Sequence, residues 1–261
     1  MLRSMTTSGL ICLQDDYNFI YKIARIDFTE WENGHFKYSF YPFYSVIDML
    51  PPHLFQGIPG LDLSLREACY ERENIVPVFI SERTPSENRE DLWRLLEDSG
   101  LDALNRLEWL IRTNKRYSGD RFFVRPPDDV EVETTTVPSM YDLGCPSNRI
   151  IERLLEIICY GDCLYCNEIT INDETRAQHY RLLMPMFIRN YNDKRNARLD
   201  GIKRAARNNA YHGRAPIDID PLLFDKIARA YLNRDISVEE ATERLGISRS
   251  TFFRRLRKFD S

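Results

Sequence analysis

The stretch that decides the fold of the C-terminal part is "SVEEATERLGISRSTFFRRLRKF", residues 237–259. Ser237 stands before an apolar periodic run, and Glu240 follows it at the spacing of a capping box at a helix start. Ser248 can cap a second helix in the same region. Because Gly246 lies between the two runs and permits a tight turn, the sequence predicts two short helices joined closely to one another.

An earlier apolar run predicts another helix in front of these two. Leu222, Leu223, Ile227 and Tyr231 repeat at helical spacing. Together the runs predict a three-helix domain over residues 213–261, in the arrangement of a helix-turn-helix. The residues expected to form its shared core are Ile236, Val238, Ala241, Leu245, Ile247, Phe252 and Leu256.

Small polar and basic side chains crowd the start of the last predicted helix. In helix-turn-helix proteins this part of the recognition helix meets base edges and phosphates in the major groove. A basic helix bundle that binds no DNA is the alternative. The residues that we expect to contact DNA here are Arg249, Ser250, Thr251, Arg254 and Arg255.

The formal net charge of −4 combines two parts of opposite sign. Residues 189–261 hold 17 Lys and Arg against 10 Asp and Glu, a balance of +7, whereas residues 1–188 hold 19 against 30, a balance of −11. A basic tail behind an acidic body is typical of a nucleic-acid-binding appendage, since Lys and Arg neutralise phosphates. Charge alone leaves an unevenly charged, solvated surface as the alternative.

A long helix is predicted from Asp173 to about Asn209, with Pro185 at a kink or at the start of a second helix. The later part of this helix is rich in Lys and Arg. A helix that only packs against a core does not need so many basic residues. We expect the helix to support a homodimer and to lie in a helical region, residues 141–212, that precedes the C-terminal domain.

Residues 1–140 are predicted to form a domain of mixed α-helices and β-strands, whose role is unknown. Alternating apolar and polar residues on both sides of Asn33 and Gly34 indicate a β-hairpin, with strands near 19–28 and 35–41. The whole chain is therefore expected to be α+β, with a mixed N-terminal domain containing a β-hairpin and helices, a long linker helix and a C-terminal three-helix domain.

Three further elements of the N-terminal domain are predicted from local signals. Residues 62–73 favour a short helix, and residues 76–80 favour a buried strand. Residues 85–113 favour a helical hairpin that begins directly after a cap at Thr84.

Cys159, Cys163 and Cys166 have a C-x3-C-x2-C spacing. This spacing resembles the cluster-binding loop of radical-SAM enzymes, but those enzymes carry the loop near the start of a long barrel. Zinc, with His179 as a fourth ligand, is a second interpretation, and small apolar residues at a helix end are a third. We expect no metal and no cofactor, and we find no convincing catalytic set in residues 1–188.

No apolar run approaches the length that a membrane span needs, and the N-terminus has too short an apolar stretch for a secretory signal. The six cysteines have scattered spacings that do not indicate a disulfide framework. We therefore expect a cytoplasmic protein without membrane contact.

The segments "RLDGIKRAARNNAYHGRAPIDID" and "SVEEATERLGISRSTFFRRL" resemble the C-terminal half of serine recombinases of the resolvase and invertase type, over about residues 187–259. The resemblance implies a dimerising helix whose basic end crosses the minor groove of double-stranded DNA, an extended arm in that groove, and a helix-turn-helix in the major groove. By this resemblance, the DNA-binding residues are Arg198, Lys203, Arg204 and Arg207 on the helix, Gly213 and Arg214 in the arm, and Ser248, Arg249, Ser250, Thr251 and Arg254 on the reading helix.

The N-terminal catalytic motif of that family is not found. Its nearest counterpart, "IARIDF", aligns Arg25 with the arginine of the motif but has Asp27 where the nucleophilic serine belongs. We therefore expect a non-catalytic DNA-binding protein of a phage or mobile genetic element, acting as a transcription regulator or accessory factor, whose acidic front binds a protein partner or sets the oligomeric state. A divergent recombinase or nuclease is one alternative, and an inhibitor of a host defence complex with an autoregulatory DNA-binding tail is another.

Overall fold

The computed structural model describes residues 4–117, 120–127, 132–208 and 217–259. The chain divides into two compact units, residues 1–194 and 195–261. The predicted α+β mixture is confirmed, as is the predicted long helix, which is α6 (Arg176–Arg207). Within the described parts of the chain, no helix combines the length and the apolar character that crossing a bilayer requires.

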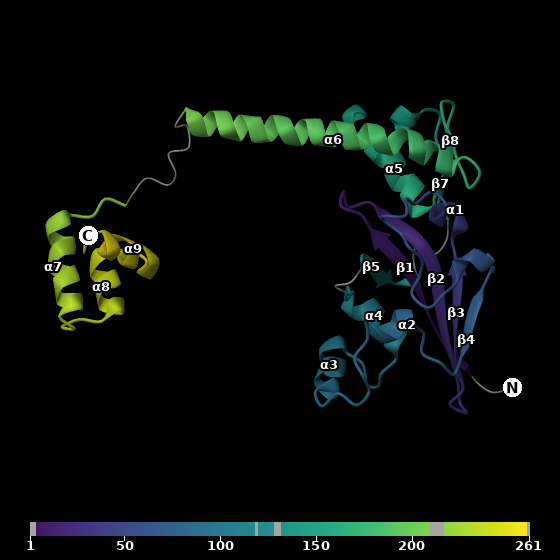
Figure 1. Ribbon diagram of the computed structural model, residues 1–261, viewed down its shortest axis with the longest axis horizontal. Helices are drawn as coiled ribbons and strands as arrows, with labels where there is room; N and C mark the ends of the chain where they lie inside the picture. The colour runs from purple at the N-terminus through teal and green to yellow at the C-terminus, as the bar shows by residue number, and fades with distance from the viewer. Residues whose placement is uncertain (1–3, 118–119, 128–131, 209–216, 260–261) are drawn as a thin grey trace. The chain divides into compact units, whose positions relative to one another are not determined.

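A five-stranded antiparallel sheet forms the centre of the first unit (Figure 1). The predicted hairpin is confirmed, because β2 and β3 pair on either side of a turn in which Gly34 has a φ of +78°. This φ lies in the left-handed region that glycine adopts readily. The strand order is β4 (Tyr70–Glu73), β3 (Phe36–Pro42), β2 (Ile20–Trp31), β1 (Ser4–Gln14) and β5 (Phe122–Arg125).

Short helices pack against this sheet. α1 (Tyr44–Ile47) and α5 (Ile150–Tyr160) contact β2, whereas α4 (Arg106–Thr113) contacts β1 and β5. Gly9 lies in β1 beneath α4, and a Cβ atom at this position would come within 2.9 Å of the Val124 side chain on β5 and within 3.3 Å of the Leu107 and Ile111 side chains on α4. The absence of a side chain at residue 9 therefore permits the close approach of strand and helix.

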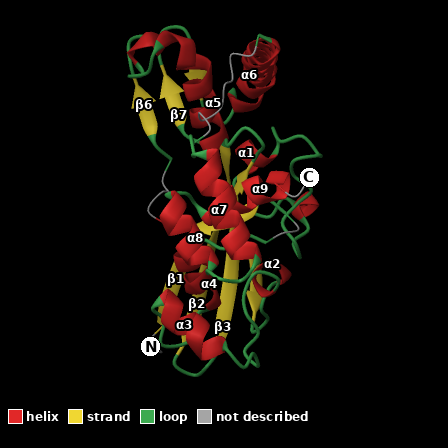
Figure 2. Ribbon diagram, turned by 90° about the vertical axis from the view of Figure 1, so that its left-hand side faces the viewer, coloured by secondary structure: helices red, strands yellow, loops and turns green. Residues whose placement is uncertain are grey.

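A smaller sheet continues the first unit (Figure 2). β6 (Thr134–Thr136) runs parallel to β7 (Cys163–Tyr165), which pairs antiparallel with β8 (Thr170–Ile171). Leu164 and Ile171 are fully buried in the same hydrophobic core as the strands of the large sheet. Because this core continues past residue 140, the division between the units falls near residue 194 and differs from the predicted boundaries at 140 and 212.

Arg176 fixes the first turn of α6 to the end of α5. Its side chain is fully buried, and its guanidinium donates hydrogen bonds of 3.0–3.5 Å to backbone carbonyl oxygens. These carbonyls lie in the last turn of α5 and just after it, where a helix leaves its acceptors unpaired and favours positive charge. The four carbonyls belong to Ile157, Ile158, Gly161 and Asp162.

The second unit contains the three predicted C-terminal helices, α7 (Pro221–Leu232), α8 (Val238–Leu245) and α9 (Arg249–Phe259). Phe252 is fully buried at their centre and contacts the rings of Phe224, Tyr231 and Phe253. Every residue predicted for the shared core is buried or half-buried in this cluster: Ile236, Val238, Ala241, Leu245, Ile247, Phe252 and Leu256.

Three local predictions in the first unit are wrong. The helix expected over residues 62–73 is a short 3-10 turn followed by β4, because pairing with β3 extends this segment at the sheet edge. The strand expected over 76–80 is instead α2 (Val78–Ser81), preceded by Pro77. The hairpin expected from residue 85 begins only at α3 (Leu92–Ser99), because the Thr84 hydroxyl donates to the Ile80 carbonyl and caps no helix.

Candidate nucleic-acid interface

The turn between α8 and α9 is built as the sequence predicts. The Ser237 side chain accepts a hydrogen bond of 3.2 Å from the Glu240 amide and caps α8. Gly246 ends α8 with a φ of +61°. The Ser248 hydroxyl accepts a hydrogen bond of 3.3 Å from the Thr251 amide at the start of α9. Local capping and one left-handed glycine thus fix where α9 starts.

α9 has an apolar face and a basic face. Phe252 and Leu256 are buried, with exposed fractions of 0% and 9%. Ser250, Arg254 and Arg257 are exposed and repeat at i, i+4 and i+7. At 3.6 residues per turn these three side chains lie opposite the buried pair. α9 therefore presents a hydroxyl and two guanidinium groups on its outer face, and the helix contains no acidic residue.

Arg249 is also exposed at the start of α9, but it has contacts within the unit. Its guanidinium lies 3.6 Å from a carboxylate oxygen of Glu239 and over the ring of Phe253. Exposed ion pairs of this kind are weak, so a phosphate can replace the carboxylate at small energetic cost. Arg249 can therefore reorient towards a ligand without disturbing the core.

Two of the residues predicted to bind DNA, Ser248 just before α9 and Arg255 within it, have structural contacts. The Arg255 guanidinium donates a hydrogen bond to the carbonyl oxygen of Ile217 and ties α9 to the segment before α7. The Ser248 hydroxyl serves as the cap described above and also lies 3.0 Å from the Thr251 hydroxyl. These groups hold α9 in place within the unit, whereas Arg254 is exposed on its outer face.

Arg257 also lies on the exposed outer face of α9, although it is not among the residues predicted to contact DNA. The predicted DNA-contacting residues lie in the first turns of the last helix, and Arg257 lies beyond those turns. Its spacing of three residues from Arg254, on the side opposite Phe252 and Leu256, is the signal that identifies it.

The second half of α6 is an exposed basic surface. Residues 189–207 hold seven Lys and Arg against two Asp, a balance of +5. All four positions predicted on this helix are exposed, and among them Arg204 donates to the Asp200 carbonyl oxygen at 3.3 Å. These positions are Arg198, Lys203, Arg204 and Arg207. Gly213 and Arg214, predicted for the arm, lie outside the described residues.

The cysteine motif does not assemble into a metal centre in the described part of the chain, where no group of three or more His, Cys, Asp or Glu side chains could hold an ion. Cys159 is buried in α5, and burial raises the pKa of its thiol. The Cys166 thiol donates to the Ile169 carbonyl, and the His179 ring lies 2.9 Å from the Thr170 carbonyl oxygen. Cys163 begins β7, at the pairing position opposite Thr134.

The segment nearest to a recombinase motif forms an ion pair. Arg25 donates two hydrogen bonds of 2.7 and 2.8 Å to the carboxylate of Asp27 on β2. A carboxylate held in this way supplies no hydroxyl for attack on a phosphodiester.

Comparisons of the chain with family models, with curated proteins and with solved structures find no match.

Proposed function

We propose that this protein is a sequence-specific double-stranded DNA-binding protein, derived from a recombinase and acting without catalysis as a regulator or accessory factor of a mobile genetic element or prophage. The observation that carries the proposal is the outer face of α9, where Ser250, Arg254 and Arg257 lie opposite the buried Phe252 and Leu256. This is the side-chain set that reads base edges and phosphates from the major groove.

In this proposal α8, the turn at Gly246 and α9 form a helix-turn-helix. Arg254 and Ser250 face the base edges, with guanine as the preferred partner of Arg254 because a guanidinium can bond O6 and N7 together. Arg257 and Arg249 contact phosphates at either end of the reading surface. The core of the unit, centred on Phe252, gives α9 a rigid platform.

The basic half of α6 supplies a second, sequence-independent contact. Its Lys and Arg side chains are exposed over five turns without a matching number of acids, as phosphate binding requires. Arg204 and Arg207, in the last turn, are the residues assigned to the DNA backbone.

The same helix supports a homodimer as the active form. Tyr191, Leu199 and Ile202 are 44%, 44% and 41% exposed on α6. Ile202 continues the side of the helix that Tyr180 and Met184 bury in the first unit. A second copy of the helix would cover these side chains, and a twofold dimer would present two α9 helices to two half-sites.

The test compares specific and non-specific binding. The full chain is mixed with random and genomic DNA fragments, and the retained fragments are sequenced. Selective retention of a short repeat is the expected result. Gel analysis of the same samples for covalent protein–DNA adducts separates this proposal from a recombinase or nuclease activity, which would produce adducts or nicks.

Arg254→Ala should weaken binding to the selected repeat by about tenfold or more while changing affinity for random duplex much less, because it removes base readout worth about 1–3 kcal/mol. Arg204→Ala should weaken both about equally. Arg229→Ala, which removes an exposed arginine paired with Asp225 on α7, is the control for lost charge. Equal losses on all sequences for Arg254→Ala would contradict base reading by this residue.

A further inference from the structure

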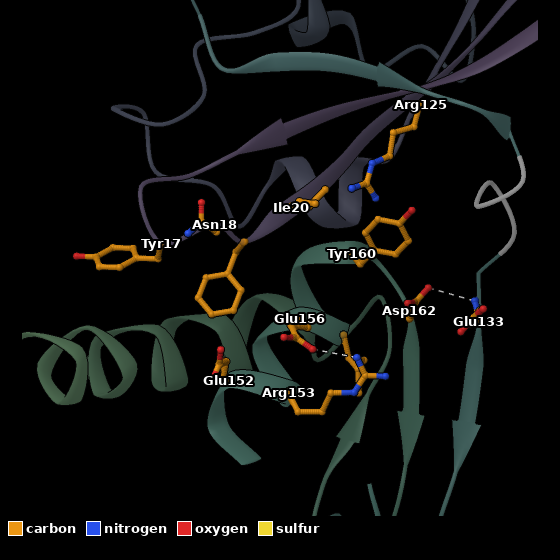
Figure 3. A pocket seen from close by; sticks show the side chains of 12 residues that line it. Tyr17, Asn18, Ile20, Arg125, Glu133, Glu152, Arg153, Glu156, Tyr160 and Asp162 are labelled. Carbon is orange, nitrogen blue, oxygen red and sulfur yellow. Dashed lines mark hydrogen bonds and ion pairs between the residues drawn. The ribbon is translucent and has the colours of Figure 1, made fainter. Parts of the chain in front are cut away.

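The first unit contains a cavity of about 650 Å³, a size typical of small-molecule sites (Figure 3). One wall is the turn between β1 and β2 with the start of β2, and a second is the side of α5. Arg125 at the end of β5 and the segments that begin β6 and β7 complete it. The lining residues are Tyr17, Asn18, Phe19, Ile20, Arg125, Glu133, Glu152, Arg153, Glu156, Ile157, Tyr160 and Asp162.

The lining combines an apolar wall with opposed charges. Aromatic and aliphatic side chains come from the turn before β2, from the first residue of β2 and from α5, which suits a ligand with an apolar group. The charged side chains are two arginines and four carboxylates, a balance of −2. Arg153 is bound to Glu156 at 2.9 Å, and Glu152 is bound outside the cavity to Arg149 at 2.9 Å.

Among the described residues that line the cavity, Arg125 is the cation without a carboxylate partner. Its half-buried guanidinium lies 5.3 Å from the ring centre of Phe123, and it has no ion pair among the described residues. Figure 3 shows the guanidinium directed towards Ile20 and Tyr160, into the space above the carboxylates of α5. A partly desolvated guanidinium in this position favours a carboxylate, which it can bind through two hydrogen bonds.

One carboxylate of the cavity, that of Asp162, is partly desolvated as well. Asp162 accepts a hydrogen bond of 3.2 Å from the Glu133 amide, and its carboxylate lies 4.0 Å from the buried ammonium of Lys22. Burial raises the pKa of Asp162. Burial disfavours the charged form of a carboxylate, and an additional cation nearby stabilises that form.

We propose that this cavity binds a small amphipathic zwitterion of dipeptide size and net positive charge. The ligand carboxylate binds Arg125, its ammonium groups lie beside the carboxylates of Glu133 and Asp162, and its apolar side chain packs on the wall formed by Phe19, Ile157 and Tyr160. Size, apolar surface and charge of the lining all match this class of ligand.

Two residues that line the cavity, Tyr17 and Phe19, also contact α6. Tyr17 packs edge-on against Phe187 and Tyr191 at ring distances of 5.8 and 5.3 Å, and Phe19 packs against Phe187 at 4.9 Å. A ligand that orders this turn therefore also acts on the helix that carries the basic surface. An effect of the ligand on DNA affinity rests on the proposed function, whereas ligand binding itself does not.

The test is calorimetric titration of the full chain, without DNA, with the dipeptide phenylalanyl-lysine. Wild-type protein should bind it, and its C-terminal amide should bind about tenfold or more weakly because the carboxylate for Arg125 is gone. Arg125→Gln should lose about the same factor for the free acid and should no longer distinguish acid from amide. Arg94→Gln, on the exposed face of α3, is the control and should bind both like wild type.

The comparison of the two dipeptides on unaltered protein keeps the test valid even where Arg125→Gln affects folding. No heat of binding at millimolar dipeptide would overturn the proposal. Equal affinity of wild-type protein for acid and amide would also overturn it, since Arg125 would then have no role. Because DNA is absent from every titration, these outcomes are independent of the DNA-binding proposal.

Discussion

At the scale of single residues, Arg176 joins α6 to α5, two helices that the sequence pattern does not link to one another. It stands in the first turn of α6, yet its partners are carbonyls at the end of α5 and in the turn after it. A fully buried guanidinium is tolerated because several acceptors surround it and because the C-terminus of a helix carries partial negative charge.

Arg176→Ala should lower the free energy of unfolding of the first unit by about 3 kcal/mol or more, because it leaves buried carbonyl oxygens without donors. Arg176→Lys should recover only part of the loss, since one ammonium cannot serve the same set of acceptors. Urea unfolding followed by tryptophan fluorescence measures this, because Trp31, Trp93 and Trp109 all lie in the first unit. Arg189→Ala, at an exposed position of α6, is the control, and a loss as small as that of Arg189→Ala would contradict the role of Arg176.

The sequence identifies individual residues well where local rules apply and poorly where tertiary contacts decide. Ser237, Gly246 and Ser248 are predicted correctly, because caps and turns depend on neighbouring residues. Arg255 is predicted to contact DNA from its charge alone. Its hydrogen bond to the Ile217 carbonyl could not be predicted in this way, because the bond depends on how the helices pack. No pattern in the sequence predicts that Arg176 is buried, because its burial depends on where α5 lies in the folded chain.

At the scale of elements, α6 shows how packing overrides a local helix breaker. The helix runs from Arg176 to Arg207 with Pro185 inside it. Proline removes one backbone hydrogen bond and disfavours the helix interior. The burial of Leu183 and Met184 beside it, together with the anchoring of Arg176, offsets this cost.

Pro185→Ala should therefore raise the free energy of unfolding of the first unit by about 2–3 kcal/mol, because it restores a helical hydrogen bond while Pro185 itself is exposed. Tryptophan fluorescence in urea again reports the change. Met186→Ala, at the neighbouring exposed position, should change the stability by less than about 0.5 kcal/mol. Destabilisation by Pro185→Ala would show that the proline ring contributes packing that outweighs the lost hydrogen bond.

Elements with strong periodicity or turn signals are predicted from the sequence, and elements defined by their partners are not. The β2–β3 hairpin and α7 to α9 follow from the Asn-Gly turn and from helical spacing. β1 has Thr, Ser and Gly at its start and becomes a strand by pairing with β2 and β5 on either side. β4 is an edge strand whose sequence favours a helix locally, so its conformation is determined by β3.

At the scale of the whole molecule, the two units differ in charge and in chemistry. The acidic first unit holds the cavity beneath Arg125, whereas the basic half of α6 and α9 carry the surfaces assigned to DNA. The charge asymmetry is visible in the sequence. The cavity is not, because its lining residues come from distant parts of the chain that only the fold brings together.

We propose that the basic side chains of α6 and α9 bind the phosphates of double-stranded DNA. Such binding releases counterions, so the logarithm of the affinity falls linearly with the logarithm of the salt concentration. About five phosphate contacts predict a slope near −4.5, which is roughly a 500-fold loss of affinity between about 50 and 200 mM salt.

The most direct measurement is a salt titration of the full chain on a random duplex by fluorescence anisotropy, repeated for Arg204→Ala and for Arg229→Ala. We predict a steep negative slope for the wild type, a slope less steep by about one for Arg204→Ala, and an unchanged slope for Arg229→Ala. Absence of binding at low salt, or an affinity that does not depend on salt, would contradict the claim and leave α9 as a packing element.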